Sequence, residues 1–239
     1  MRAAAILLAL AVTAAAAPKP AQKSTPKPAA KSASKPAAKT RSSPALAGSP
    51  GAGQPSVKNA IALMQKDDLA GAKAALDEAL KATPNDALIL LNLGIVEYRR
   101  KNFPEAETLL QRAVRNDPAL AQAWMILGIV RQDQGKLDAS LAALAQAVFL
   151  DPKNARAHHY LGVTIGRKGW YSGAEDEMRK AIELQPDYAE AHFNLAVFYL
   201  QRQPPAIELA RRHYQKALDL GAAPDAQVAR SIGGAAEPP

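Results

Sequence analysis

The chain contains no cysteine, few aromatic residues and, before Asp67, no acidic residue. The absence of cysteine excludes disulfides, zinc-finger spacings, thiol catalysis and lipoprotein acylation. Aromatic residues make up only 5% of the sequence, whereas alanine is abundant. Because alanine favours helices and is depleted in strands, the composition predicts an all-α protein with closely packed helices.

The missing acids leave the N-terminal segment strongly basic. All 22 acidic residues lie at Asp67 or beyond, and from Ser42 onward the chain has as many bases as acids. The formal net charge of +8 therefore belongs to the N-terminal segment and not to the rest of the chain. Its lysines recur every four residues, at Lys19, Lys23, Lys27, Lys31, Lys35 and Lys39.

Residues 1–16 have the pattern of a secretory signal peptide. Arg2 precedes an apolar run from Ala3 to Val12, and Ala14-x-Ala16 fits a cleavage site. We expect cleavage after Ala16 and a periplasmic or secreted protein. The alternative is an uncleaved N-terminal membrane anchor, which is disfavoured because a span needs about 20 apolar residues.

Residues 17–55 are rich in proline, lysine and alanine and almost lack large apolar side chains. Such a segment cannot bury enough surface to offset its chain entropy, so we expect a disordered arm that acts as a spacer. The alternative is an electrostatic tether whose lysines bind an anionic surface or polymer. Nucleic acid is a disfavoured partner, because the arm has no aromatic residues to stack on bases.

The sequence LGIV occurs at residues 93–96 and again at 127–130, which is an interval of 34 residues. Prolines follow the same interval at Pro84, Pro118, Pro152 and Pro186. A recurring proline ends a helix in each copy, and small residues in register with it let two helices approach closely. The repeat therefore predicts consecutive helix pairs.

This pattern resembles the tetratricopeptide repeat family, whose unit is a pair of antiparallel helices. The resemblance rests on Leu93, Gly94, Ala106, Ala113, Pro118, Trp124, Leu127, Gly128, Ala147, Pro152, Leu161, Gly162, Ala174, Ala181 and Pro186. It implies a right-handed solenoid over residues 56–224 with about five helix-turn-helix units, at 53–86, 87–120, 121–154, 155–188 and 189–224. We expect the first helix to begin near Ser56. A short closing helix with Val228 and Ile232 as apolar contacts, followed by a frayed tail, is expected over 225–239.

In this family the first helices of successive units line a concave groove. The resemblance implies that a protein or peptide partner would contact Met64, Leu88, Leu91, Ile95, Tyr98, Gln122, Met125, Ile129, Gln132, Arg156, His159, Val163, Phe193 and Val197. One position is β-branched and apolar in every unit, and its residues are Ile61, Ile95, Ile129, Val163 and Val197. This stripe either faces a partner or packs between neighbouring first helices.

No phosphate loop, nucleophile elbow or metal motif is present, and we expect neither catalysis nor a cofactor. His158 and His192 are 34 residues apart and could form half of a metal site. The better interpretation is that both pack inside the helix pairs, because Trp124 occupies the same position one unit earlier. The sequence thus predicts an exported scaffold or adaptor, with bacterial envelope assembly as the expected setting.

Overall fold

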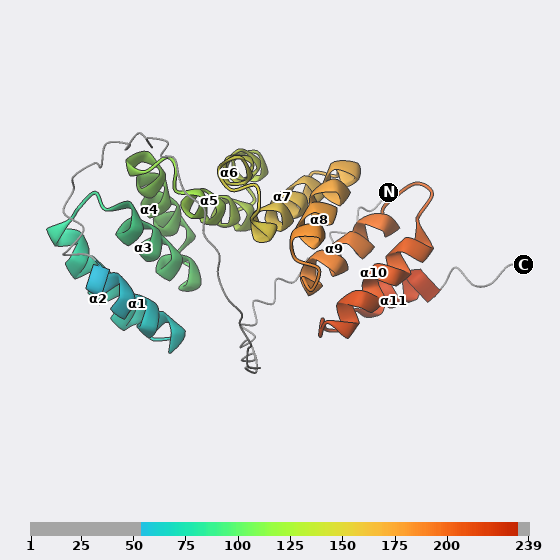
Figure 1. Cartoon of the computed structure of the whole chain (residues 1–239), viewed down its shortest axis with the longest axis horizontal. Coiled ribbons are helices and arrows are strands. Elements are labelled where there is room, and N and C mark those ends of the chain that lie inside the picture. Colours follow the sequence, from blue (N-terminus) through green and yellow to red (C-terminus); the bar gives the residue numbers. More distant parts are fainter. Residues whose placement is uncertain (1–53, 234–239) are drawn as a thin grey trace, which may run out of the picture. The chain divides into compact units, whose positions relative to one another are not determined.

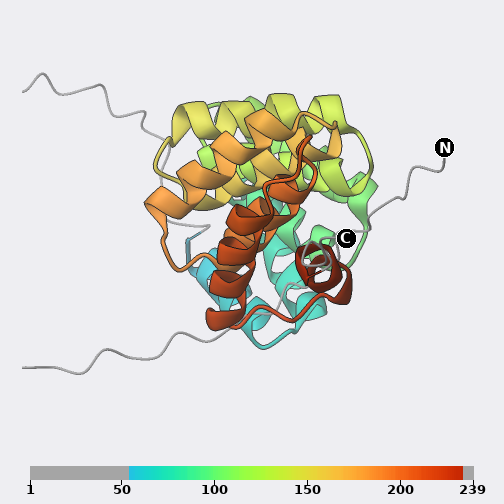
Figure 2. The same ribbon diagram turned by 90° about the vertical axis from the view of Figure 1, so that its right-hand side faces the viewer.

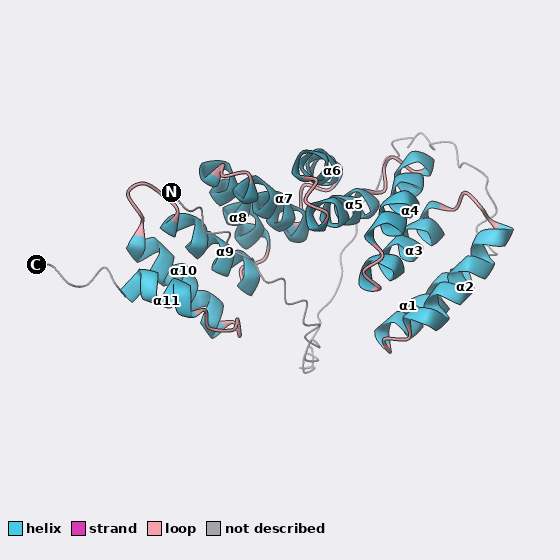
Figure 3. Cartoon of the chain, turned by 180° about the vertical axis from the view of Figure 1, so that it is seen from behind, coloured by secondary structure: helices cyan, strands magenta, loops and turns pink. Residues whose placement is uncertain are grey.

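A computed structural model describes residues 54–233, and within this range the chain consists of eleven helices and no strands (Figures 1 and 3). The predicted signal peptide and most of the predicted arm lie outside the described residues, as do residues 234–239. The expectation of an all-α fold is confirmed.

The helices follow one another at short, regular intervals along the chain. Their bounds are α1 Gln54–Gln65, α2 Leu69–Ala82, α3 Ala87–Arg99, α4 Phe103–Asn116, α5 Ala121–Asp133, α6 Leu137–Leu150, α7 Ala155–Arg167, α8 Tyr171–Leu184, α9 Ala189–Leu200, α10 Ile207–Asp219 and α11 Ala226–Gly233. Each predicted unit therefore contains two helices, and we call these units one to five.

Helices pack first within a unit and then onto the next unit. The two helices of every unit contact each other, and the second helix of each unit also contacts the first helix of the following one. Neighbouring first helices also contact each other, in the pairs α1 and α3, α3 and α5, α5 and α7, and α7 and α9. This pattern is that of a repeat array in which each unit buries its apolar surface against its neighbours.

The Leu-Gly step of units two and three marks a close approach of the paired helices. A Cβ added to Gly94 would lie 2.6 Å from Cγ of Leu110, and one added to Gly128 would lie 2.5 Å from Cγ of Leu144. Both leucines are fully buried. Glycine is therefore required here by space, because any side chain would push the second helix away.

The first helix of units one to four is followed by one residue with a left-handed backbone. Gly135 and Gly169 occupy this position with φ of 76° and 81°, while Asp67 and Lys101 adopt it with φ of 62° and 63°. Only glycine reaches this region without steric cost, so the turns of units one and two carry backbone strain that those of units three and four avoid.

The two ends of the array are formed by α1 and α11. Helix α1 begins at Gln54, two residues before Ser56, because Pro55 is compatible with the first turn of a helix. At the other end, α11 packs on α10 (Figure 2) and buries Val228 and Ile232. The hydroxyl of Tyr214 donates to the carbonyl of Asp225 at 3.0 Å, which attaches the turn before α11 to α10.

Candidate partner-binding face

The apolar stripe that recurs in every first helix is open at one end of the array and closed along the rest. Ile61 is 40% exposed and Ile95 is half-buried. The equivalent Ile129, Val163 and Val197 are only 3%, 3% and 8% exposed. A partner can therefore reach this stripe in units one and two, whereas in units three to five it belongs to the core.

Larger neighbours explain the closure of the stripe at Ile129. Ile129 shares a core cluster with Met125 and Tyr160, which come from α5 and α7. At the position of Tyr160, unit two has the polar Asn92, whose amide bends back to donate to the carbonyl of Leu88 at 2.7 Å. Unit two follows Ile61 as unit four follows Ile129, so Ile61 has the polar Asn92 where Ile129 has an aromatic ring. The corresponding residue for Ile95 is Ile126, which is smaller than a tyrosine.

The predicted groove residues separate into three groups by burial. Leu88 and two polar side chains, Gln122 and Arg156, are exposed, and Ile95, Tyr98 and Phe193 are half-buried. The others are buried: Met64, Leu91, Met125, Ile129, Gln132, His159, Val163 and Val197. We define the first-helix face as the accessible set Ile61, Leu88, Ile95, Gln122, Arg156 and Phe193.

Leu88 is the most exposed apolar side chain of the first-helix face, at 50%. It lies in the first turn of α3, which Asp86 caps by accepting hydrogen bonds from the backbone N–H groups of Leu88 and Ile89 at 2.9 and 3.1 Å. The equivalent residues of the next three units are Gln122, Arg156 and Glu190, all exposed. At this position the face is thus apolar in α3 and polar in α5, α7 and α9, while the half-buried Phe193 adds an apolar residue farther along α9.

Tyr98 joins two units through its hydroxyl group. Its hydroxyl donates to Oδ2 of Asp133 at 2.8 Å, which connects α3 to α5. Burial and the hydrogen bond to the carboxylate raise the pKa of Tyr98 above its usual value. One unit earlier, Arg99 donates to the carbonyl of Met64 at 2.8 Å, so the C-terminal ends of successive first helices are connected in sequence.

Gln132 is fully buried and forms a polar network in place of a binding surface. Its Nε2 donates to Oγ1 of Thr164 at 2.8 Å, and Ser140 donates to the carbonyl of Gly128 at the same distance. The two hydroxyls lie 3.2 Å apart. Buried polar groups are costly when unpaired, so these contacts favour one arrangement of α5, α6 and α7, although Oε1 of Gln132 has no hydrogen-bond partner among the described residues.

His159 is buried between units four and five. Its Nδ1 lies 3.2 Å from the hydroxyl of Tyr188 and its Nε2 lies 2.9 Å from the amide nitrogen of Asn194. Burial, with a smaller contribution from the charge of Arg156, lowers the pKa of His159 to about 4. The ring is therefore neutral at pH 7 and serves as a hydrogen-bonded core residue.

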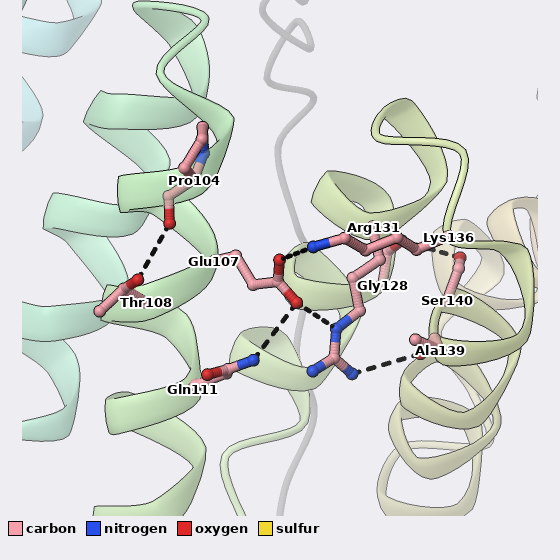
Figure 4. Close-up of polar contacts among 9 residues, drawn as sticks. All are labelled: Pro104, Glu107, Thr108, Gln111, Gly128, Arg131, Lys136, Ala139 and Ser140. Atoms are coloured by element: carbon pink, nitrogen blue, oxygen red, sulfur yellow. Dashed lines mark hydrogen bonds and ion pairs between the residues drawn. The ribbon is translucent and has the colours of Figure 1, made fainter.

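An ion cluster that the sequence analysis did not single out connects units two and three (Figure 4). Glu107 on α4 accepts from Nε of Arg131 at 2.9 Å and from Nζ of Lys136 at 2.6 Å. Its partial burial opposes ionisation, but these two hydrogen bonds outweigh it and lower the pKa of Glu107. Arg131 and Lys136 lie 24 and 29 residues after Glu107, so no short-range sequence motif predicts this cluster.

His158 and His192 point to the turns that precede their helices and not to each other. Their Nε2 atoms each lie 3.1 Å from a proline carbonyl oxygen, of Pro152 and Pro186 respectively. The indole Nε1 of Trp124 donates to the carbonyl oxygen of Pro118 in the same way, at 2.9 Å. The repeated position therefore supplies a ring nitrogen to the turn. Among residues 54–233, no group of three or more potential metal ligands comes together.

None of the helices over the described range is both long and apolar enough to cross a membrane. The predicted signal peptide, the anchor alternative and the arm lysines fall outside that range, so they stay predictions.

Comparison with known proteins points to one family. Models of the tetratricopeptide repeat match residues 57–121, 130–169 and 177–219. No curated protein matches the sequence. Among solved structures, MamA is 27% identical over 67% of this chain and 93% of its own, with a TM-score of 0.60. YrrB, described as a protein with an unusual peptide-binding site, is 23% identical over 77% and 91%, with a TM-score of 0.60.

PilF of Pseudomonas aeruginosa is 17% identical over 77% of this chain and 84% of its own, with a TM-score of 0.70. At that identity the likeness shows the fold alone. Together with the helix pairs, the 34-residue interval and the glycine contacts, the matches identify the chain as a member of the tetratricopeptide repeat family, whose proteins are non-enzymatic scaffolds for protein interaction.

Proposed function

We propose that this chain is a scaffold that binds a segment of another protein through the first-helix face, with the apolar part of that segment on α1 and α3. The observation that carries the proposal is the exposure of Leu88 and Ile61, at 50% and 40%. Their equivalents farther along the array are polar at the surface or apolar and buried. Apolar side chains left accessible beside a polar surface are typical of interaction sites.

The face also suggests how the bound segment is arranged. Its apolar residues would contact Leu88, Ile61 and Ile95, and its polar residues would continue over Gln122 towards Arg156. Arg156 is exposed and presents a planar set of donors that suits a carboxylate. A segment with apolar residues at one end and an acidic residue at the other therefore fits best. The peptide-binding site named for YrrB supports a peptide ligand by analogy with that protein.

Selection from a displayed library of random 12-residue peptides tests the proposal with the full-length protein. We expect selected peptides to combine apolar residues with an acidic one and to lose binding to Ile61→Glu/Leu88→Glu by more than about tenfold, since each apolar contact is worth about 1 kcal/mol or more. Leu209→Glu on α10 is the matched control, because Leu209 is 38% exposed but lies on a second helix. Equal binding to the double variant and the control would contradict the proposal.

We infer further that the scaffold acts after export, on the basis of the signal pattern in residues 1–16. The protein purified from its own cells should then begin at Ala17. N-terminal sequencing that instead finds Met1 or Arg2 would contradict cleavage and favour the uncleaved anchor.

A further inference from the structure

Helix α6 has an outward face unlike that of any other second helix. Ala142, Ala145 and Phe149 are exposed, and their spacing of three and four residues places them on one side of the helix. Phe149 is 78% exposed, the most of any large apolar side chain in residues 57–233. We call these three residues, with Gln146, the α6 face.

The other second helices show that the repeat itself does not require an apolar residue there. The positions equivalent to Phe149 carry a charge in all four other units, namely Lys81, Arg115, Glu183 and Asp219. The positions equivalent to Ala145 are also polar or charged, namely Asp77, Gln111, Arg179 and Gln215. The α6 face is therefore a departure that packing within the chain does not explain.

Within the described residues, α6 packs against α5 and α7 through its opposite side, where Ser140, Ala143, Leu144 and Ala147 are buried. Nothing in residues 54–233 covers Phe149. Exposing an aromatic ring to water costs free energy that a partner surface would recover.

We propose that the α6 face binds α6 of a second copy of this chain in an antiparallel, two-fold symmetric pair. Phe149 lies seven residues from Ala142, which is about 10 Å along the same side of the helix. With the two-fold axis between Ala145 and Gln146, Phe149 of each copy lies opposite Ala142 of the partner subunit. The face is thus self-complementary, with a large ring opposite a small residue on both sides of the axis, as a two-fold interface requires.

The charged residues near the two ends of α6 also favour the antiparallel pairing. The same axis brings Asp138, in the first turn of α6, to the end of the partner subunit's α6, and the turn after that helix carries Lys153 of the partner subunit. The side chain of Asp138 is 88% exposed although it contacts Lys168, and Lys153 is exposed in the turn after α6. An acid therefore faces a base at both ends of the pair, whereas the parallel arrangement would place like charges side by side.

The contact is small, since one helix face falls below the ~1,200 Å² of a standard interface. The pair is therefore a weak, concentration-dependent dimer. It lies on a second helix and so is separate from the first-helix face, and its failure would leave the proposed peptide binding unaffected.

Sedimentation equilibrium of the full chain over a wide concentration range tests the pairing. The mass should rise from the monomer value of 25.3 kDa towards twice that value. Phe149→Lys should weaken association by more than about tenfold, because two rings lose their contacts in each dimer. The variant should fold, since Lys81 and Arg115 occupy the same position elsewhere. Leu209→Lys is the control. A wild-type monomer at every concentration, or a dimer insensitive to Phe149→Lys, would overturn the proposal.

A cysteine placed beside the axis tests the register, because the chain has no cysteine of its own. Ala145→Cys should form a disulfide-linked dimer under mild oxidation, and adding Phe149→Lys should reduce the yield about tenfold. Ala74→Cys, at the position of Ala142 in the exposed side of α2, is the control. Equal crosslinking at both sites would overturn the pairing. Asp138→Lys should weaken the dimer, and adding Lys153→Asp should restore it.

Discussion

Arg167 on α7 donates from Nη1 to the main-chain carbonyl oxygen of Gln132 at 2.8 Å, across an interval of 35 residues. The carbonyl belongs to the last turn of α5, where helical hydrogen-bonding partners run out. Arg99 makes the same bond to Met64 two units earlier. The arginines therefore satisfy the ends of neighbouring first helices and hold one unit on the next.

Arg167→Met should lower the free energy of unfolding by about 1 kcal/mol, because a hydrogen bond from a charged group is lost at a partly exposed site. The methionine keeps the apolar stem of the side chain, so packing is preserved. Urea denaturation followed by circular dichroism measures the change. Arg156→Met, an exposed arginine at the start of the same helix, should leave the transition midpoint close to that of the wild type.

Gly128→Ala should destabilise the protein by about 1–3 kcal/mol, since the new Cβ would lie 2.5 Å from Cγ of Leu144 and force the helix pair apart. Gly173→Ala on α8 is the matched control, because its nearest atom would be 3.4 Å away. The free energy of unfolding of that variant should rise by about 0.5 kcal/mol, because alanine has a higher helix propensity than glycine. If both substitutions changed the free energy of unfolding in the same direction, close packing would not be the reason for glycine at position 128.

Lys101→Gly should raise the free energy of unfolding by about 0.5 kcal/mol, because glycine adopts the left-handed backbone without the clash that a Cβ causes. Lys101→Ala keeps the Cβ and should bring no such gain. Thermal unfolding compares the two variants. A gain with alanine equal to that with glycine would assign the effect to the loss of charge.

Acid should destabilise the protein between pH 6.5 and about 4 through His159, whose pKa is lowered to about 4 by burial and by Arg156. In this window the unfolded chain binds a proton that the folded chain does not, so stability falls as the pH falls. The contribution is about 1–3 kcal/mol at pH 4. Urea denaturation at pH 7, pH 5 and pH 4 measures the change.

His159→Gln retains hydrogen-bonding capacity towards Tyr188 and Asn194 but cannot be protonated, so its stability should depend less on pH. The remaining slope should come mainly from His213, whose pKa is also lowered, first by burial and then by His192 and Arg179. An unchanged slope in His159→Gln would show that His159 is not the titrating group.

The sequence was sufficient to predict those features that depend on local spacing. Prolines at an interval of 34 residues end helices wherever they occur, and the order of helix pairs follows from them. The glycines before Ile95 and Ile129 were also predictable as packing positions, because only a very small residue lets two helices approach.

What only the tertiary structure decided is which side chains remain accessible. Ile61 and Ile129 occupy equivalent positions, yet one is 40% exposed and the other 3%. The difference comes from Met125 and Tyr160, which pack with Ile129, and no rule of spacing predicts how far a neighbour's side chain reaches. Gln132 has a polar side chain suited to a surface but pairs with Thr164 in the core. Periodicity thus determined the array, while the size and pairing of neighbouring side chains decided where a partner can bind.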